Sequence, residues 1–156
     1  MQSIYKVARI AARQIEPAYL LVNRIAPMLD LEGWRASCWE VLSDKGPRCG
    51  QDDIIVATNP LGYVQGLCVT AVRRHIVYGR MLDVSILAVA SAADEAGVMS
   101  DLLLHLKALA GAEACDGIRI WAAGNNAEGP CFIGHRVNSS DHGTLITLDQ
   151  SSLRDG

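Results

Sequence analysis

The segment from Leu82 to Asn126 constrains the fold more than any other part of the chain. It begins with an apolar run, Leu82–Ala90, that is typical of a buried strand, and it continues through a short acidic loop into a leucine-rich stretch with helical spacing. A second apolar run, Ile118–Trp121, follows and ends in Gly124-Asn-Asn126. This order predicts two parallel strands joined by a crossover helix. The free N–H groups at the start of that helix would lie at a sheet edge, where anionic cofactors commonly bind.

Length and composition favour one compact domain, residues 1–156, with a sizeable core, since 50% of the 156 residues are hydrophobic and 20% are charged. The formal net charge of −3 leaves no cationic surplus for non-specific binding to nucleic acid. No apolar run is long enough to span a bilayer, and Met1–Lys6 lacks the apolar core of a secretory signal. We therefore expect a cytoplasmic protein with no nucleic-acid or membrane partner, and a flexible tail over residues 150–156.

The cysteines and histidines give no sign of a metal centre. The five cysteines are odd in number, widely spaced and without a C-x-x-C pair, so neither a disulfide framework nor a zinc knuckle is indicated. The four histidines are equally scattered. We expect no metal site.

The remaining patterns predict a mixed α/β (α+β) domain. Tyr5–Ala12 is expected to be an edge strand, with the start of a helix as the alternative. Pro17 stands where a helix favours its first residue, and apolar residues recur with helical spacing up to Leu29. A second helix is expected from Asp30.

Turn residues then divide a β-rich region into strands. Asn59-Pro-Leu-Gly62 and Tyr78-Gly79 are turn sequences between apolar runs, so we expect an antiparallel meander. The other expected elements are a loop over Ser43–Asp53, meander strands Ile54–Ala57, Tyr63–Arg74 and Arg80–Ala90, a helix Val98–Ala114, strands Ile118–Ala122 and Thr144–Leu148, and a short helical turn after Gly129-Pro130.

This order of elements resembles the GNAT N-acyltransferase superfamily over nearly the whole chain. Leu87-Ala-Val-Ala90, leading through a short loop to Gly97-Val98, resembles the family's acyl-CoA segment. Asn126-Ala127 with Gly134-His135 resembles its Asn-x-x-Ala to Gly-Phe stretch, and Gly143–Leu148 resembles its last strand. The resemblance implies a mixed, twisted central sheet flanked by helices, with acetyl-CoA as the co-substrate.

The resemblance also assigns residues to the acyl donor. The backbone of Leu87 and Val89 would hold the pantetheine arm beside a β-bulge, and Asn126 would contact the CoA arm. The backbone of the segment after the acidic loop would hold the diphosphate. That segment comprises Gly97, Val98, Met99 and Ser100.

The diphosphate loop departs from the family pattern Arg/Gln-x-x-Gly-x-Gly/Ala. The matching window is Asp94-Glu-Ala-Gly97-Val-Met99, in which Gly97 alone agrees. Asp94 replaces the cationic or amide residue, and two neighbouring carboxylates repel a diphosphate. The alternative role of Asp94 and Glu95 is to cap the helix, where carboxylates favour the positive end of the dipole.

Asp83 is the candidate general base, because it is the only carboxylate within the predicted meander strands. Strand alternation puts Asp83 and Ser85 on one face. The residues expected on the opposite face are Leu82, Val84 and Ile86. The alternative is a structural ion pair between Asp83 and one of Arg73, Arg74 and Arg80.

The family's proton-donating tyrosine has no counterpart here. Cys131 occupies the matching position, either as a proton donor or as a small packing residue. The first hypothesis is an acyl-CoA-dependent N-acetyltransferase that moves an acetyl group to a small-molecule or peptide amine by direct attack. The second is a GNAT-fold CoA-binding or regulatory module with weak or lost catalysis, and the third is an unrelated α/β domain. A homodimer is left open.

Overall fold

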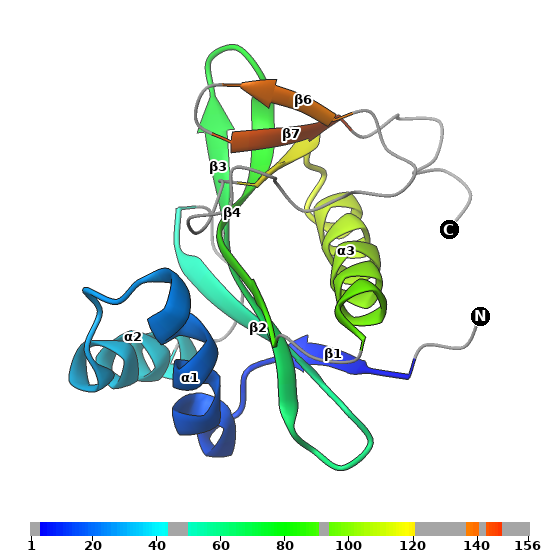
Figure 1. Ribbon diagram of the computed structural model, residues 1–156. Coiled ribbons are helices and arrows are strands. Elements are labelled where there is room, and N and C mark those ends of the chain that lie inside the picture. Colours follow the sequence, from blue (N-terminus) through cyan, green and yellow to red (C-terminus); the bar gives the residue numbers. More distant parts are fainter. Residues whose placement is uncertain (1–3, 44–49, 91–93, 121–136, 141–142, 148–156) are drawn as a thin grey trace.

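A central sheet flanked by helices organises the part of the chain that the computed structural model describes, residues 4–43, 50–90, 94–120, 137–140 and 143–147. The elements are β1 (Lys6–Arg9), a 3₁₀ turn η1 (Ala12–Gln14), α1 (Ile15–Ile25), α2 (Leu31–Ser43), β2 (Asp52–Thr58), β3 (Val64–His75), β4 (Gly79–Val89), α3 (Glu95–Ala112), β5 (Gly117–Ile120), β6 (Val137–Ser140) and β7 (Gly143–Thr147). The sheet has seven strands in the order β1-β2-β3-β4-β5-β7-β6. Helices α1 and α2 lie on one side of it and α3 on the other (Figure 1).

The strand pairing confirms the predicted topology. β2, β3 and β4 form the antiparallel meander, and β4 runs parallel to β5 from Met81↔Gly117 to Val84↔Ile120. Helix α3 is the crossover between these two strands. No helix in the described residues is both long and apolar enough to cross a membrane.

Two apolar clusters form the core, one on each face of the sheet. Besides Leu103, helix α3 buries one residue per turn, because a spacing of four residues keeps side chains on one side of a helix. Those residues are Val98, Leu102, Leu106 and Ala110, and they pack on β4 and β5 through Leu82, Val84, Ile118 and Ile120. On the other face Trp34 is buried among residues of α1 and the strands, and its indole N–H donates to the Ile15 carbonyl at 2.7 Å.

A β-bulge at Ser85 changes the face alternation of β4. Val84 pairs with Thr70 and Ile86 pairs with Val69, so Ser85 has no partner on β3. Beyond the bulge, Ile86 packs with the cluster under α1 and α2, whereas Val84 packs with the cluster under α3. The expectation that Ile86 shares a face with Leu82 and Val84 is therefore wrong, since one inserted residue reverses a period of two.

Other boundaries differ from the sequence prediction. Helix α1 ends at Ile25, before Pro27, and α3 begins at Glu95 because Asp94 caps it. The strand at the N-terminus is limited to Lys6–Arg9, and β6 was not predicted. The expected helical turn after Pro130, the tail over residues 150–156 and the end of the strand at 121–122 lie outside the described residues.

Buried thiols give a test of the core. Cys38 and Cys68 are fully buried, and burial raises the pKa of each thiol from 9.0 to about 12. At pH 8 such a thiol is a thiolate about one part in ten thousand, and the thiolate is the reactive form. We expect iodoacetamide to leave both cysteines unmodified in the native protein and to alkylate both in denaturant, as measured by peptide mass spectrometry. Native alkylation at the denatured rate would contradict this packing.

Candidate active site

Asp83 is a buried carboxylate on β4 with one oxygen in an ion-pair cluster. Its side chain is 7% exposed, and Oδ2 lies 3.4 Å from His75 Nε2 and 3.8 Å from Arg73 Nε. The other oxygen, Oδ1, is buried and has no hydrogen-bond partner in the described part of the chain. Because a buried acceptor without a donor is costly, this oxygen is a candidate contact for a ligand or a transferred proton.

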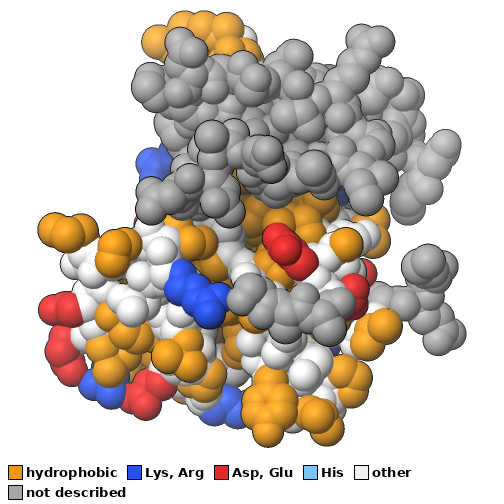
Figure 2. Space-filling view, viewed as in Figure 1, with side chains coloured by type: hydrophobic (Ala, Val, Ile, Leu, Met, Phe, Trp, Pro, Cys, Tyr) orange, Lys and Arg blue, Asp and Glu red, His pale blue; other side chains and the backbone are white. Residues whose placement is uncertain are grey.

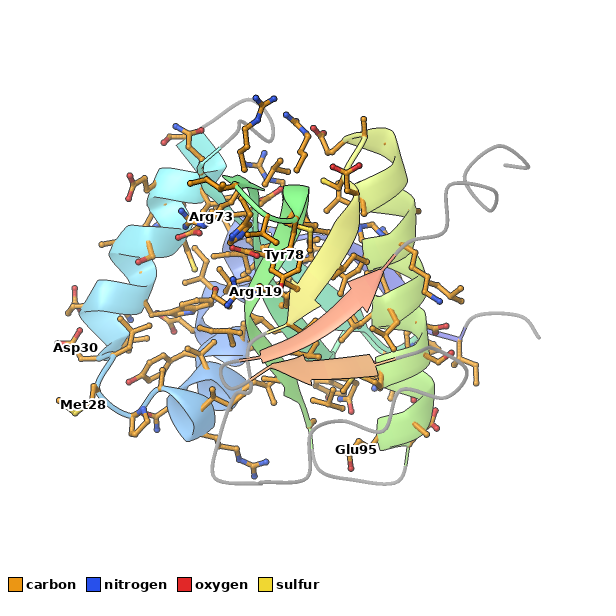
Figure 3. All side chains as sticks on the ribbon, turned by 90° about the horizontal axis from the view of Figure 1, so that it is seen from above. Met28, Asp30, Arg73, Tyr78, Glu95 and Arg119 are labelled. Atoms are coloured by element: carbon orange, nitrogen blue, oxygen red, sulfur yellow. The ribbon has the colours of Figure 1, made fainter. Side chains whose placement is uncertain are left out.

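The register of the sheet explains why these groups meet. Asp83 pairs with Ala71 on β3, which makes Arg73 its diagonal neighbour, and it pairs with Arg119 on β5. Figure 3 shows the side chains of Arg73, from β3, and Arg119, from β5, on the α2 side of the sheet. Of the arginines proposed as ion-pair partners, Arg73 is beside Asp83, whereas Arg80 lies 3.5 Å from Glu113.

A pocket of about 370 Å³ lies between α2 and the sheet, at the bulge. Ser85 and Ile86 belong to its lining, so it lies next to Asp83 along β4. Two lining residues, Glu40 and Asp52, carry carboxylates, and none of the described lining residues is Lys, Arg or His. The full lining is Leu29, Trp34, Ser37, Glu40, Val41, Gly50, Gln51, Asp52, Ile54, Val69, Ser85 and Ile86. The pocket therefore suits a positively charged ligand with an apolar body.

In the second half of β4, alternate residues direct their backbone groups away from β3. The Ala90 N–H donates to the Gln65 carbonyl at 2.8 Å, so Ala90 belongs to the residues whose backbone faces β3. Antiparallel pairing alternates, and Leu87 and Val89 therefore point their N–H and C=O groups to the other edge. Among the described residues β5 pairs with β4 only as far as Val84.

The N-terminus of α3 is capped by Asp94. Its carboxylate accepts the Gly97 N–H at 3.2 Å and the Tyr5 hydroxyl at 2.6 Å. This hydrogen bond and the nearby negative charge of Asp94 raise the pKa of the Tyr5 phenol. A Cβ atom added to Gly97 would lie 2.3 Å from Asp94 Oδ2, which shows how closely the carboxylate covers this turn.

The other residues assigned to the diphosphate differ in exposure. Val98 is buried in the core under α3, Met99 packs against that core, and Ser100 is exposed. Asn126 and Cys131 lie outside the described residues. No group of three or more His, Cys, Asp or Glu residues within the described ranges is arranged to hold a metal ion.

Comparisons with known proteins give matches among solved structures alone. No protein-family model matches the chain, and no curated protein does. A structure of the aminoglycoside N-acetyltransferase AAC(6')-Iy with the bisubstrate analogue CoA-S-monomethyl-acetylneamine superposes with a TM-score of 0.63 at 14% identity, over 86% of this chain and 99% of that one.

Two further solved structures have the same fold. A PaiA N-acetyltransferase from Thermoplasma acidophilum in complex with coenzyme A gives a TM-score of 0.61 at 8% identity, over 94% of this chain and 98% of that one. A transcriptional regulator from Bacillus halodurans C-125 gives 0.60 at 16% identity, over 88% of this chain and 99% of that one. The strand order, the crossover helix and these likenesses together show that the chain has the GNAT fold.

Sequence reasoning missed three features of the site. His75 was not identified as a partner of Asp83, although counting back from the turn at Tyr78-Gly79 places it on the neighbouring strand of the hairpin. The contact between Tyr5 and Asp94 joins positions 89 residues apart and has no local signal. The pocket likewise depends on how α2 packs against the sheet.

Proposed function

We propose that the chain is an N-acetyltransferase of the GNAT type, which moves an acetyl group from acetyl-CoA to the amine of a small molecule or peptide by direct attack. The observation that carries the proposal is Asp83, a buried carboxylate with one oxygen without a partner in the described residues, beside a β-bulge and an acid-lined pocket. The solved N-acetyltransferases with the same fold support it.

The acyl donor fits one part of this site and not another. The backbone edge at Leu87 and Val89 suits an extended pantetheine arm, because it offers N–H and C=O groups at the spacing of a strand. The N-terminus of α3 does not suit a diphosphate, because the Asp94 carboxylate already accepts the free N–H group of Gly97 there. When bound, the donor supplies an acetyl group activated as a thioester.

The chain's own residues position the acceptor and take its proton. The carboxylates of Glu40 and Asp52 attract an ammonium group into the pocket, and the apolar floor holds the body of the molecule. Asp83 Oδ1 then accepts the proton that the amine must lose before it can attack. Arg73 and His75 contact the other oxygen, which leaves Oδ1 as the oxygen that takes this proton. Cys131 stays a candidate proton donor to the leaving group.

A pocket-filling variant tests the acceptor site. Ser37→Trp places a large ring in the pocket from the exposed side of α2, and we expect the KM for the amine to rise by about tenfold or more, with the KM for acetyl-CoA unchanged. Ala36→Trp is the matched control, since Ala36 is exposed on α2 and does not line the pocket. The assay is acetyl transfer to a panel of amines, read by mass spectrometry. Equal effects of the two variants would place the acceptor elsewhere.

A second candidate is a GNAT-fold binding or regulatory module without catalysis. Asp94 at the start of α3 favours it, because the carboxylate lies where a diphosphate would approach the helix. The likeness to a transcriptional regulator supports the same alternative. Binding of acetyl-CoA with no transfer to any amine of a broad panel would favour this second function.

A further inference from the structure

The N-terminus of α3 is closed by the chain itself. Asp94 accepts the Gly97 N–H at 3.2 Å, so its carboxylate uses a helix-terminal donor that an anionic ligand would otherwise bind. The ideal Cβ position of Gly97 lies within 2.3 Å of Asp94 Oδ2 and 2.6 Å of Oδ1. The space that a small residue leaves above this turn is therefore filled by the carboxylate.

Tyr5 holds this carboxylate in place from another element. It directly precedes the edge strand β1, and its hydroxyl donates to Asp94 Oδ2 at 2.6 Å. Its backbone N–H lies 3.4 Å from Asp101 Oδ2, which ties the same residue to the second turn of α3. Both contacts join segments more than 85 residues apart in sequence, as the separations of 89 and 96 show.

The described residues around Asp94 do not offset the negative charge of its carboxylate. Among the described residues no Lys, Arg or His forms an ion pair with Asp94, and the first turn of α3 adds Glu95. Figure 3 shows Glu95 beside the start of α3, and the face in Figure 2 carries red carboxylates on the right-hand side, where α3 lies, as well as on the left-hand side. A diphosphate that approached this turn would meet negative charge at short range.

The residues at the backbone edge of β4 carry no charge that would repel a ligand. Leu87 and Val89 turn their side chains into the core under α3, so the edge presents main-chain groups and no charge. The two parts of the donor are therefore recognised independently. The backbone edge of β4 can hold the neutral pantetheine arm, while the N-terminus of α3 excludes the anionic diphosphate.

We propose that this protein recognises its acyl donor by the pantetheine arm and makes no favourable contact with the nucleotide diphosphate. The reason is that Asp94, held by Tyr5, occupies the diphosphate's place at α3. The donor class is then the thioesters of pantetheine in general, with or without the nucleotide. This inference rests on the proposed function and specifies the substrate of the same site.

Binding of CoA and of pantetheine to the full chain tests the inference without turnover. We expect isothermal titration calorimetry to give dissociation constants that agree within about threefold. CoA binding about 100-fold tighter than pantetheine would overturn the inference and leave the proposed function standing. Failure of both ligands to bind at millimolar concentration would overturn the proposed function and the inference with it.

A variant that removes the charge of Asp94 tests whether this residue causes the loss of diphosphate recognition. Asp94→Ser keeps a helix-capping oxygen but removes the charge, so we expect CoA affinity to rise by about tenfold relative to pantetheine affinity. Glu95→Gln is the matched control, because it removes one charge from the same turn and leaves Asp94 in place. An unchanged ratio in Asp94→Ser, or an equal gain in Glu95→Gln, would overturn the role of Asp94. Thermal unfolding checks that both variants are folded.

Discussion

Replacing Asp83 by asparagine is expected to lower turnover by roughly 10²- to 10⁴-fold at neutral pH, with nearly constant affinity for the acyl donor. Asparagine keeps the shape of the side chain and can accept a hydrogen bond, but it cannot take the proton that the amine must lose. The donor contacts proposed at Leu87 and Val89 lie beyond the bulge and use the backbone, so they are not altered. Steady-state kinetics with the best amine of the panel measures both quantities.

Two further measurements separate a base from a structural ion pair. Raising the pH should restore part of the rate of Asp83→Asn, because an amine that is already neutral in solution needs no base. Asp52→Asn is the control variant: Asp52 lies 3.7 Å from Arg73 but is 59% exposed, so its loss should affect acceptor KM more than turnover. If Asp83→Asn loses stability together with activity and high pH restores nothing, Asp83 serves the fold, and the free amine attacks without a protein base.

His75 and Arg73 have a positioning role in this scheme. Both contact the same oxygen of Asp83, which leaves Oδ1 as the oxygen with no partner in the described residues. A carboxylate bound on one side is preorganised, because its rotation would break both contacts. The proposal thus requires that Oδ2 of Asp83 binds Arg73 and His75 while Oδ1 accepts the proton of the amine.

Much of the fold follows from sequence patterns because those patterns are local. The period of four in α3 and the apolar run of β4 are each set by which side chains must be buried, and they predicted the parallel pair of β4 and β5 correctly. The alternation of β4 also placed Asp83 opposite Leu82 and Val84, as observed. Asp94 caps the N-terminus of α3, a role that the acidic loop before the helix was enough to predict.

The features that sequence could not predict depend on long-range packing. The bulge at Ser85 follows from the register of β3 against β4, and a run such as Ser-Ile-Leu-Ala-Val does not show which residue is inserted. It moves Ile86 to the face of the sheet on which the pocket lies, so this part of the pocket lining also depends on the bulge. The hydrogen bond from Tyr5 to Asp94 requires β1 to lie beside the start of α3, which is a property of the whole sheet.

Leu106→Ala is expected to lower the free energy of unfolding by about 2 to 5 kcal/mol, because it removes a large side chain from a packed core. Leu106 is fully buried where α3 packs on the sheet, whereas Leu104 on the same helix is 61% exposed. Leu104→Ala is therefore the matched control and should change stability by no more than about 0.5 kcal/mol. Urea denaturation of the two variants, compared at equal m-values, gives both numbers.

This pair of variants also tests the orientation of α3, on which the proposed donor site depends. Helix α3 joins β4 to β5, and Asp94 at its N-terminus meets Tyr5 only if the buried stripe faces the sheet. A large loss for Leu104→Ala with little loss for Leu106→Ala would mean that α3 is rotated about its axis. The N-terminal turn would then face away from Tyr5, and the explanation for donor selection would fail at its first step. The expected result, a large loss for Leu106→Ala alone, leaves the donor affinities of the folded protein as the remaining test of that explanation.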